Sequence, residues 1–286
     1  MLTNKAIAKK EGFSSLYKVF DDRYVEVGDR MDEYLKRIQI TDLCQLCFDF
    51  VSKNYNPLIK SIKQSGFTIR KIEDKIKLKD LFDKLMNGHF SIISALNYAF
   101  TSNLLKKSES YIHLKENNER YLSDLKKDKQ YQEFKTYYLG GQNTFARIKD
   151  SFTLASEEEF DDYESRLKRE TFIGRINSDE IKFAEAINYH KYINEHSKNI
   201  TMHKTKGSSI DSVIVVMEEF FWTSEYDFSL LYSDEVIQSK KWDNSQKLIY
   251  VACSRARKDL TCVKFVTPDE EAGFCKRFPM ARKILI

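Results

Sequence analysis

The spacing of apolar side chains divides the chain into a long helical part and a shorter part of mixed character. Through residues 23–196, apolar positions recur every three or four residues, as on one face of an α-helix. Met31, Leu35 and Ile38 follow this pattern early, and residues 92–105 lack charged side chains, which is typical of a buried helix. We therefore predict an almost entirely helical domain over residues 23–196.

The periodicity changes in the last third of the chain. Residues 213–217 form a short apolar run rich in β-branched side chains, which predicts a strand buried on both faces of a parallel sheet. A helix is predicted over residues 243–257, opened by Asp243 or Asn244, and residues 260–266 form a second β-rich run. A strand, a helix and a strand in this order predict an α/β unit.

Composition supports a folded chain and excludes several classes of protein. The 286 residues are 42% hydrophobic and 31% charged, which excludes a disordered chain, while 9 glycines and 3 prolines disfavour a turn-rich all-β fold. The five cysteines form no disulfide framework, and no apolar stretch has the about 20 residues that span a bilayer. We therefore expect a cytoplasmic protein with no membrane partner. The net charge of +4 permits nucleic-acid binding without requiring it.

The residues that precede the first predicted strand gather groups that can contact phosphates. Thr201, His203 and Lys206 supply a hydroxyl, an imidazole and an ammonium group, and Gly207 lets the backbone approach a ligand closely. An ordinary basic loop that leads into a strand would have the same composition, and from composition alone it is the more frequent explanation.

A second segment, Tyr-Val-Ala-Cys-Ser-Arg-Ala-Arg at residues 250–257, places basic side chains at the end of the predicted helix. Arg255, Arg257 and Lys258 lie in its last predicted turn, where cations interact favourably with the helix dipole. Alternatively, one of these arginines points into a cleft and stabilises the charge that develops on a transferring phosphoryl group.

The two segments together resemble motifs V and VI of the UvrD/Rep-type superfamily 1 DNA helicases. That family has Thr-x-His-x-x-Lys-Gly in the first motif and Tyr-Val-Ala-x-Thr-Arg-Ala-Arg in the second, and the order and the spacing of about fifty residues also match. The resemblance implies that Arg255 is the catalytic arginine finger and contacts the nucleotide together with Gly207. It also implies that Thr201, His203 and Lys206 bind DNA along the single-stranded track.

The same resemblance implies a fold. Residues 1–22 and 197–286 would form one discontinuous RecA-like domain with a mostly parallel sheet, in which Leu2–Thr3 is a strand. Residues 23–196 would form a large all-α insertion domain, which in the family contacts duplex DNA. The fold class is therefore α/β, with helices dominating the chain as a whole.

Two parts of a complete helicase are absent from this sequence. No Gly-x-x-x-x-Gly-Lys-Ser/Thr phosphate loop occurs, and no buried strand ends in an Asp-Glu pair suited to Mg²⁺. The resemblance thus covers the C-terminal half of an ATP-dependent 3′–5′ DNA helicase, which uses ATP and Mg²⁺ and acts on single-stranded and duplex DNA. We expect a missing N-terminal ATPase half to supply most nucleotide ligands, and the chain alone to be inactive.

One departure from the family leaves an alternative open. Ser209 stands where the family usually has a glutamate, and Asp211 is offset by two positions. The chain could then be a non-catalytic helical protein-interaction or DNA-binding module built on a degenerate helicase half. Cys44 and Cys47 are predicted to be core residues rather than zinc ligands, and no metal site is predicted. Residues 106–138 form either a DNA-contacting surface or a solvated helical face.

Overall fold

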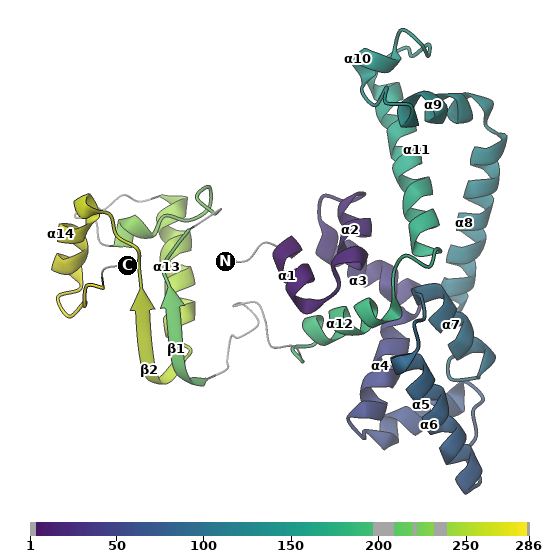
Figure 1. Cartoon of the computed structure of the whole chain (residues 1–286), viewed down its shortest axis with the longest axis horizontal. Helices are drawn as coiled ribbons and strands as arrows, with labels where there is room; N and C mark the ends of the chain where they lie inside the picture. The colour runs from purple at the N-terminus through teal and green to yellow at the C-terminus, as the bar shows by residue number, and fades with distance from the viewer. Residues whose placement is uncertain (1–3, 197–208, 220–221, 232–238, 285–286) are drawn as a thin grey trace. The chain divides into compact units, whose positions relative to one another are not determined.

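The computed structural model of the 286-residue chain describes residues 4–196, 209–219, 222–231 and 239–284 (Figure 1). Contacts gather in two compact units, each of which is described by itself. A helical unit comprises Asn4–Ser197, and a smaller sheet unit lies in the remainder of the chain. The strand expected at Leu2–Thr3 lies outside the described residues.

The helical unit confirms that helices dominate the chain. Three of its helices begin at serines, because Ser91, Ser108 and Ser156 each accept a hydrogen bond from the backbone N–H three residues later, at 3.3, 3.2 and 3.3 Å. The helices are α1 (Asn4–Glu11), α2 (Ser14–Asp21), α3 (Val27–Arg37), α4 (Ile40–Val51), α5 (Tyr55–Gln64), α6 (Ile72–Asn87), α7 (Ile92–Thr101), α8 (Glu109–Lys127), α9 (Lys129–Leu139), α10 (Phe145–Ile148), α11 (Glu157–Ile176) and α12 (Phe183–Ile193).

The main core of the helical unit surrounds α4. This helix contacts α3, α5, α6, α7 and α12, and its Leu43 side chain is fully buried. Phe82 of α6 and Leu96 of α7 are fully buried in the same core. Burial of each such side chain contributes about 1.5–3 kcal/mol to stability. The three-and-four spacing in the sequence therefore identifies the face that each helix buries.

A second, aromatic-rich core joins α9, α10 and α11 to the end of α8. Tyr131 and Phe134 of α9 are fully buried, and Phe134 stacks on Tyr163 of α11 with ring centroids 4.9 Å apart. Figure 1 shows α9 and α10 at one end of α8 and α11. The other buried members of this core are Leu125, Ile148, Phe152, Phe160 and Leu167.

Helices α1 and α2 pack within the helical unit, so the contacts do not divide at residue 22, where the sequence analysis placed the boundary. Leu16 and Phe20 are buried in the main core. In addition, the carboxylate of Glu185 in α12 accepts hydrogen bonds from the backbone N–H groups of Ser15, at 2.8 Å, and Leu16, at 2.9 Å. Residues 4–22 therefore belong with the helices on grounds of both apolar burial and hydrogen bonding.

The sheet unit confirms the predicted order of strand, helix and strand. Its two strands pair in parallel, from Ile210 opposite Ala256 to Val216 opposite Val263. Parallel strands need a crossover connection, and a helix lies in the chain between them. The elements are β1 (Ile210–Val216), the 3-10 helix η2 (Phe228–Leu231), α13 (Lys240–Cys253), β2 (Ala256–Val263) and α14 (Pro268–Arg277).

Helix α13 begins and ends earlier than the sequence analysis predicted. The hydroxyl of Ser239 accepts a hydrogen bond from the Trp242 N–H at 3.1 Å and caps the helix, so Asp243 lies in its first turn. The helix ends at Cys253. Arg257 therefore lies in β2, and the expectation that the basic residues occupy the last helical turn is wrong.

The described sheet has two strands, and one of its faces is left uncovered by the described residues. Val215 and Met217 are buried in a third core with Leu248 of α13. By contrast, Ile214 and Val216 point to the other face and are 72% and 51% exposed. The prediction that β1 is buried on both faces is therefore wrong within this part of the chain, and the full RecA-like sheet is not seen there.

Candidate nucleotide and DNA site

Arg255 is the predicted finger residue, and the structure places it at the junction of α13 and β2. It follows the last turn of the helix and precedes Ala256, the first residue of the strand. The remaining predicted site residues lie outside the described residues; they are Thr201, His203, Lys206 and Gly207.

The start of β1 lies beside Arg255. The backbone N–H of Ile210 donates a hydrogen bond to the carbonyl oxygen of Arg255 at 2.9 Å, and Ile210 stands opposite Ala256 in the sheet. Because parallel strands begin at the same edge of a sheet, the start of β1 meets the end of the 250–257 segment at this edge. Two segments that are distant in sequence therefore come together at Arg255.

The guanidinium of Arg255 bends back over the end of α13. Its Nε donates a hydrogen bond to the carbonyl oxygen of Val251 at 3.0 Å, and its Nη2 donates one to the hydroxyl of Ser254 at 2.9 Å. In this position the positive charge lies against the last carbonyl groups of the helix, where the helix dipole favours a cation. To bind a phosphate, the side chain would exchange these two hydrogen bonds for phosphate oxygens.

Asp211 binds two basic side chains of β2. Its Oδ1 lies 2.5 Å from Nη2 of Arg257, and its Oδ2 lies 2.8 Å from Nζ of Lys258. Because all three side chains are exposed, each ion pair contributes at most about 1 kcal/mol. The Asp211 carboxylate is thus engaged across the two strands.

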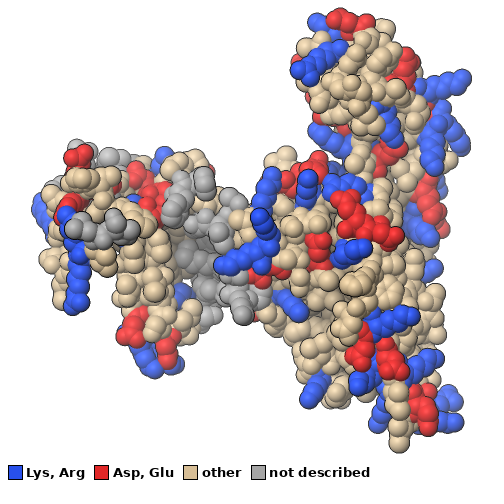
Figure 2. All heavy atoms as spheres, in the orientation of Figure 1, with Lys and Arg blue, Asp and Glu red and all other residues tan. Residues whose placement is uncertain are grey.

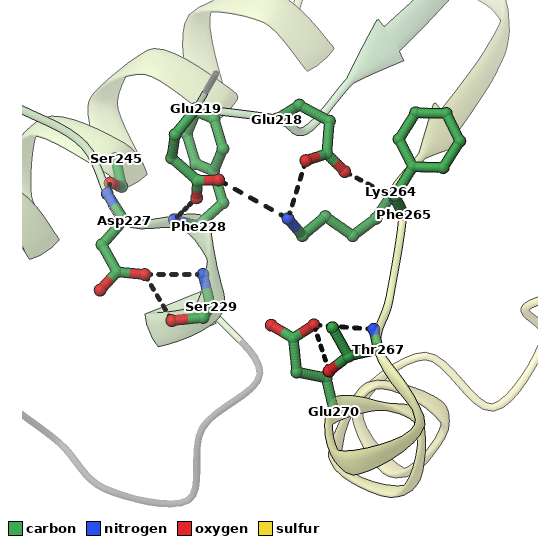
Figure 3. A network of polar contacts seen from close by, with 10 residues as sticks. All are labelled: Glu218, Glu219, Asp227, Phe228, Ser229, Ser245, Lys264, Phe265, Thr267 and Glu270. Carbon is green, nitrogen blue, oxygen red and sulfur yellow. Dashed lines mark hydrogen bonds and ion pairs between the residues drawn. The ribbon is translucent and has the colours of Figure 1, made fainter. Parts of the chain in front are cut away.

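At the opposite end of the two strands, a lysine lies between two glutamates (Figure 3). The Nζ of Lys264 lies 3.2 Å from Oε2 of Glu218 and 3.6 Å from Oε2 of Glu219. The Lys264 side chain is 7% exposed. Glu218 also accepts a hydrogen bond from the backbone N–H of Phe265 at 2.6 Å. These contacts join the chain that follows β1 to the chain that follows β2.

This group of charged side chains was not predicted, although the sequence contains a signal for it. Glu218 and Glu219 come directly after the apolar run of β1, and the carboxyl ends of parallel strands are where α/β proteins bind ligands. The structure shows that Lys264 occupies the space between the two carboxylates. Among the described residues, no cluster of three or more His, Cys, Asp or Glu side chains could hold a metal ion.

A buried serine anchors the chain after β1 to α13. The Ser245 hydroxyl is fully buried and accepts a hydrogen bond from the backbone N–H of Asp227 at 2.9 Å. Asp227 in turn accepts one from the N–H of Ser229 at 3.1 Å, and Glu219 accepts one from the N–H of Phe228. Figure 3 shows that these side chains continue the network around Lys264.

Charges of both signs are mixed on the surface of the helical unit. Figure 2 shows Lys and Arg side chains interspersed with Asp and Glu side chains over the face in view. In α8, Lys115 lies 3.8 Å from Glu119, one turn later in the helix. Residues 106–138 thus fit a solvated helical face better than a continuous phosphate-binding surface.

Cys44 and Cys47 are buried core residues, as predicted. Burial raises the pKa of the Cys44 thiol well above its usual value and raises that of Cys47 to about 12. Both side chains belong to the main core, 2% exposed each. Their role in the helical unit is therefore packing.

Comparison with known proteins gives a distant relationship. The chain is 24% identical to Gabija protein GajB of Bacillus cereus (strain HuB5-5). The match covers 91% of the chain and 38% of that protein, so the chain spans less than half the length of this relative. No protein-family model matches the sequence, and no solved structure matches it. Among the described helices, none combines the length and apolar character that crossing a membrane would need.

Proposed function

We propose that the chain is the C-terminal part of an ATP-dependent DNA helicase that moves 3′ to 5′ along a single strand. The observation that carries this proposal is the junction at Arg255, where the segment that resembles motif VI lies against Ile210 at the start of β1. The distant similarity to part of the longer Gabija protein GajB supports a role within a larger molecule.

In the proposed mechanism, Arg255 acts on the γ-phosphate of ATP. Its guanidinium would leave Val251 and Ser254 and donate hydrogen bonds to the phosphate oxygens that gain charge in the transition state. Such a contact lowers the barrier because it is stronger in the transition state than in the ground state. The DNA track, and the loop that couples it to the nucleotide, would use Thr201, His203, Lys206 and Gly207.

ATP and Mg²⁺ need more ligands than the described residues offer. Arg255 lies where β1 and β2 begin, whereas Glu218 and Glu219 lie where the strands end and are engaged by Lys264. These residues fit one contact to the γ-phosphate and do not fit the metal. An N-terminal ATPase half would hold the rest of the nucleotide with Mg²⁺. Closure of the two halves around ATP would then shift them along DNA.

ATPase measurements on the longer protein test the role of Arg255. We expect Arg255→Ala to lower single-strand-stimulated ATP turnover by roughly 10³-fold while ATP binding persists, because an arginine finger stabilises the transition state. Arg257→Ala is the matched control, since Arg257 stands two residues later and pairs with Asp211. Its turnover should stay within about twofold of wild type. Equal turnover in wild type and Arg255→Ala would exclude the finger.

A second candidate function is a non-catalytic helical module that binds a protein or DNA. The hydrogen bonds from Arg255 to Val251 and Ser254 favour it, because they are those of an arginine that caps a helix. If the chain has this function, Arg255→Ala would leave ATP turnover by the longer protein unchanged. It would lower the free energy of unfolding of the sheet unit by about 1 kcal/mol. DNA binding that weakens steeply with salt would indicate phosphate contacts, and no binding at low salt would favour a protein partner.

A further inference from the structure

A cavity of about 170 Å³ lies within the helical unit, between the end of α2, the end of α9 and the middle of α11. It combines apolar walls with positively charged groups, which is typical of sites for small charged ligands. The apolar walls include Leu139, Leu167 and Phe172, and the charged groups are those of Arg23, Lys168 and Arg175, with the carboxylate of Asp22.

Arg23 differs from the other charged groups of this cavity. Its guanidinium is half-buried, with Cζ 4.9 Å from the ring centroids of both Tyr24 and Phe172. Within the described chain, no carboxylate forms an ion pair with it. Burial lowers the pKa of Arg23, and the positive charge of nearby Arg169 lowers that pKa further. A partly buried cation of this kind is stabilised by an anion that reaches it.

The other cations of the cavity already have carboxylate partners. Arg175 lies 2.7 Å from Asp22 and 2.6 Å from Glu180. Lys168 lies 2.5 Å from a glutamate one turn earlier in α11. The carboxylate on the cavity wall, Asp22, is thus taken up by Arg175, which leaves the charge of Arg23 uncompensated. The guanidinium fork matches the oxygens of a phosphate group with two parallel hydrogen bonds.

We propose that this cavity binds a phosphate group through Arg23, supplied either by a free nucleotide or by a nucleic-acid strand. The rings of Tyr24 and Phe172 hold the guanidinium in place, so little side-chain freedom is lost when the phosphate binds. The buried Leu167 and Phe172 side chains on the wall lower the local dielectric constant, which strengthens charge-assisted hydrogen bonds. The site belongs to the helical unit and does not depend on the helicase proposal, which rests on Arg255.

Isothermal titration calorimetry on the full chain tests the site with three probes: inorganic phosphate, a deoxynucleoside monophosphate and a single-stranded oligonucleotide. Arg23→Gln should weaken binding about tenfold or more. Arg23→Lys keeps the charge but loses the planar fork, so it should retain part of the affinity. Arg30→Gln is the matched control, because Arg30 belongs to the same unit, is exposed and pairs with Glu33 at 3.4 Å.

A second variant keeps the test decisive if Arg23→Gln fails to fold. Leu139 lies on the cavity wall but is 68% exposed, so Leu139→Glu adds a negative charge there without disturbing a core. It should weaken binding of every phosphate probe about tenfold at low salt, and less at high salt.

Loss of phosphate and mononucleotide binding in Arg23→Gln and Leu139→Glu would identify a free nucleotide as the source of the phosphate. Oligonucleotide binding alone, with the same losses, would identify a nucleic-acid strand. Unchanged affinity in Arg23→Gln that melts at the wild-type temperature would overturn the site. Failure of all three probes to bind the wild-type chain would overturn it as well. Should Arg23→Gln unfold, unchanged affinity in Leu139→Glu would have the same meaning.

Discussion

Lys264 is the buried cation that joins the ends of β1 and β2. Its ammonium group lies between Glu218 and Glu219, and its removal would leave two carboxylates in a largely dehydrated position. We predict that Lys264→Met lowers the free energy of unfolding of the sheet unit by roughly 3 kcal/mol. Both tryptophans of the chain, Trp222 and Trp242, belong to this unit, so chemical denaturation followed by tryptophan fluorescence measures the loss.

The control for this variant is an exposed lysine of the same unit. Lys283 lies 2.8 Å from Glu271 and is 60% exposed, so Lys283→Met should change the free energy of unfolding by no more than about 0.5 kcal/mol. An equally small change in Lys264→Met would contradict the account of the buried group. Adding Glu218→Gln and Glu219→Gln to Lys264→Met should recover part of the stability, because burying a neutral amide costs less free energy than burying a carboxylate.

At the scale of single residues, the sequence predicts which residues have suitable chemistry more reliably than it predicts which residues they contact. The spacing within motif VI identifies Arg255, but its bonds to Val251 and Ser254 depend on how the helix ends. Nothing in the sequence marks Arg23, because its neighbour Phe172 lies far along the chain and is brought near by the packing of α2 against α11. Contacts of this kind follow from tertiary structure and leave no local pattern.

At the scale of elements, two side chains of α9 hold α11 through Glu170. This carboxylate accepts a hydrogen bond from the Tyr131 hydroxyl at 2.6 Å and one from Lys135 at 2.8 Å. Burial by itself would raise the pKa of Glu170. The hydrogen bonds from Lys135 and Tyr131 outweigh burial, so the pKa lies below its usual value of 4.5.

This lowered pKa predicts an acid dependence with a definite sign. Glu170 stabilises the helical unit above its unfolded-state pKa, and the contribution is lost as the pH falls through the lower folded-state pKa. We expect Glu170→Gln to be less stable than wild type at neutral pH and to lose less stability between about pH 5 and about pH 3. Thermal unfolding followed by far-ultraviolet circular dichroism measures both. If the melting temperatures of the two proteins changed equally with pH, the result would contradict this linkage.

The existence of elements could be predicted from the sequence more reliably than their ends and surroundings. Met31 and Leu35 predicted α3 because they share one helical face, and both are buried. The choice of Ser239 rather than Asp243 as the cap of α13 could not be predicted, since both residue types cap helices well. The exposure of Ile214 could not be predicted either, because an apolar run predicts a strand but not how many of its faces are covered.

At the scale of the whole molecule, the described chain has separate hydrophobic cores in its two units. We predict two unfolding transitions in scanning calorimetry, with the sheet unit melting first because its core is small. Its core consists of Val215, Met217, Phe228 and Leu248. Lys264→Met should shift the lower transition and leave the upper one in place. One cooperative transition that this variant moves as a whole would rule out independent units.

The central claim is that this chain gives a 3′–5′ DNA helicase its arginine finger. Strand displacement by the longer protein tests it most directly, with ATP and duplexes that carry either a 3′ or a 5′ single-stranded overhang. We predict unwinding of the 3′-overhang duplex, loss of unwinding in Arg255→Ala, and near wild-type unwinding in Arg257→Ala. Unwinding by Arg255→Ala at the wild-type rate, or no unwinding by the wild-type protein on either duplex, would contradict the claim.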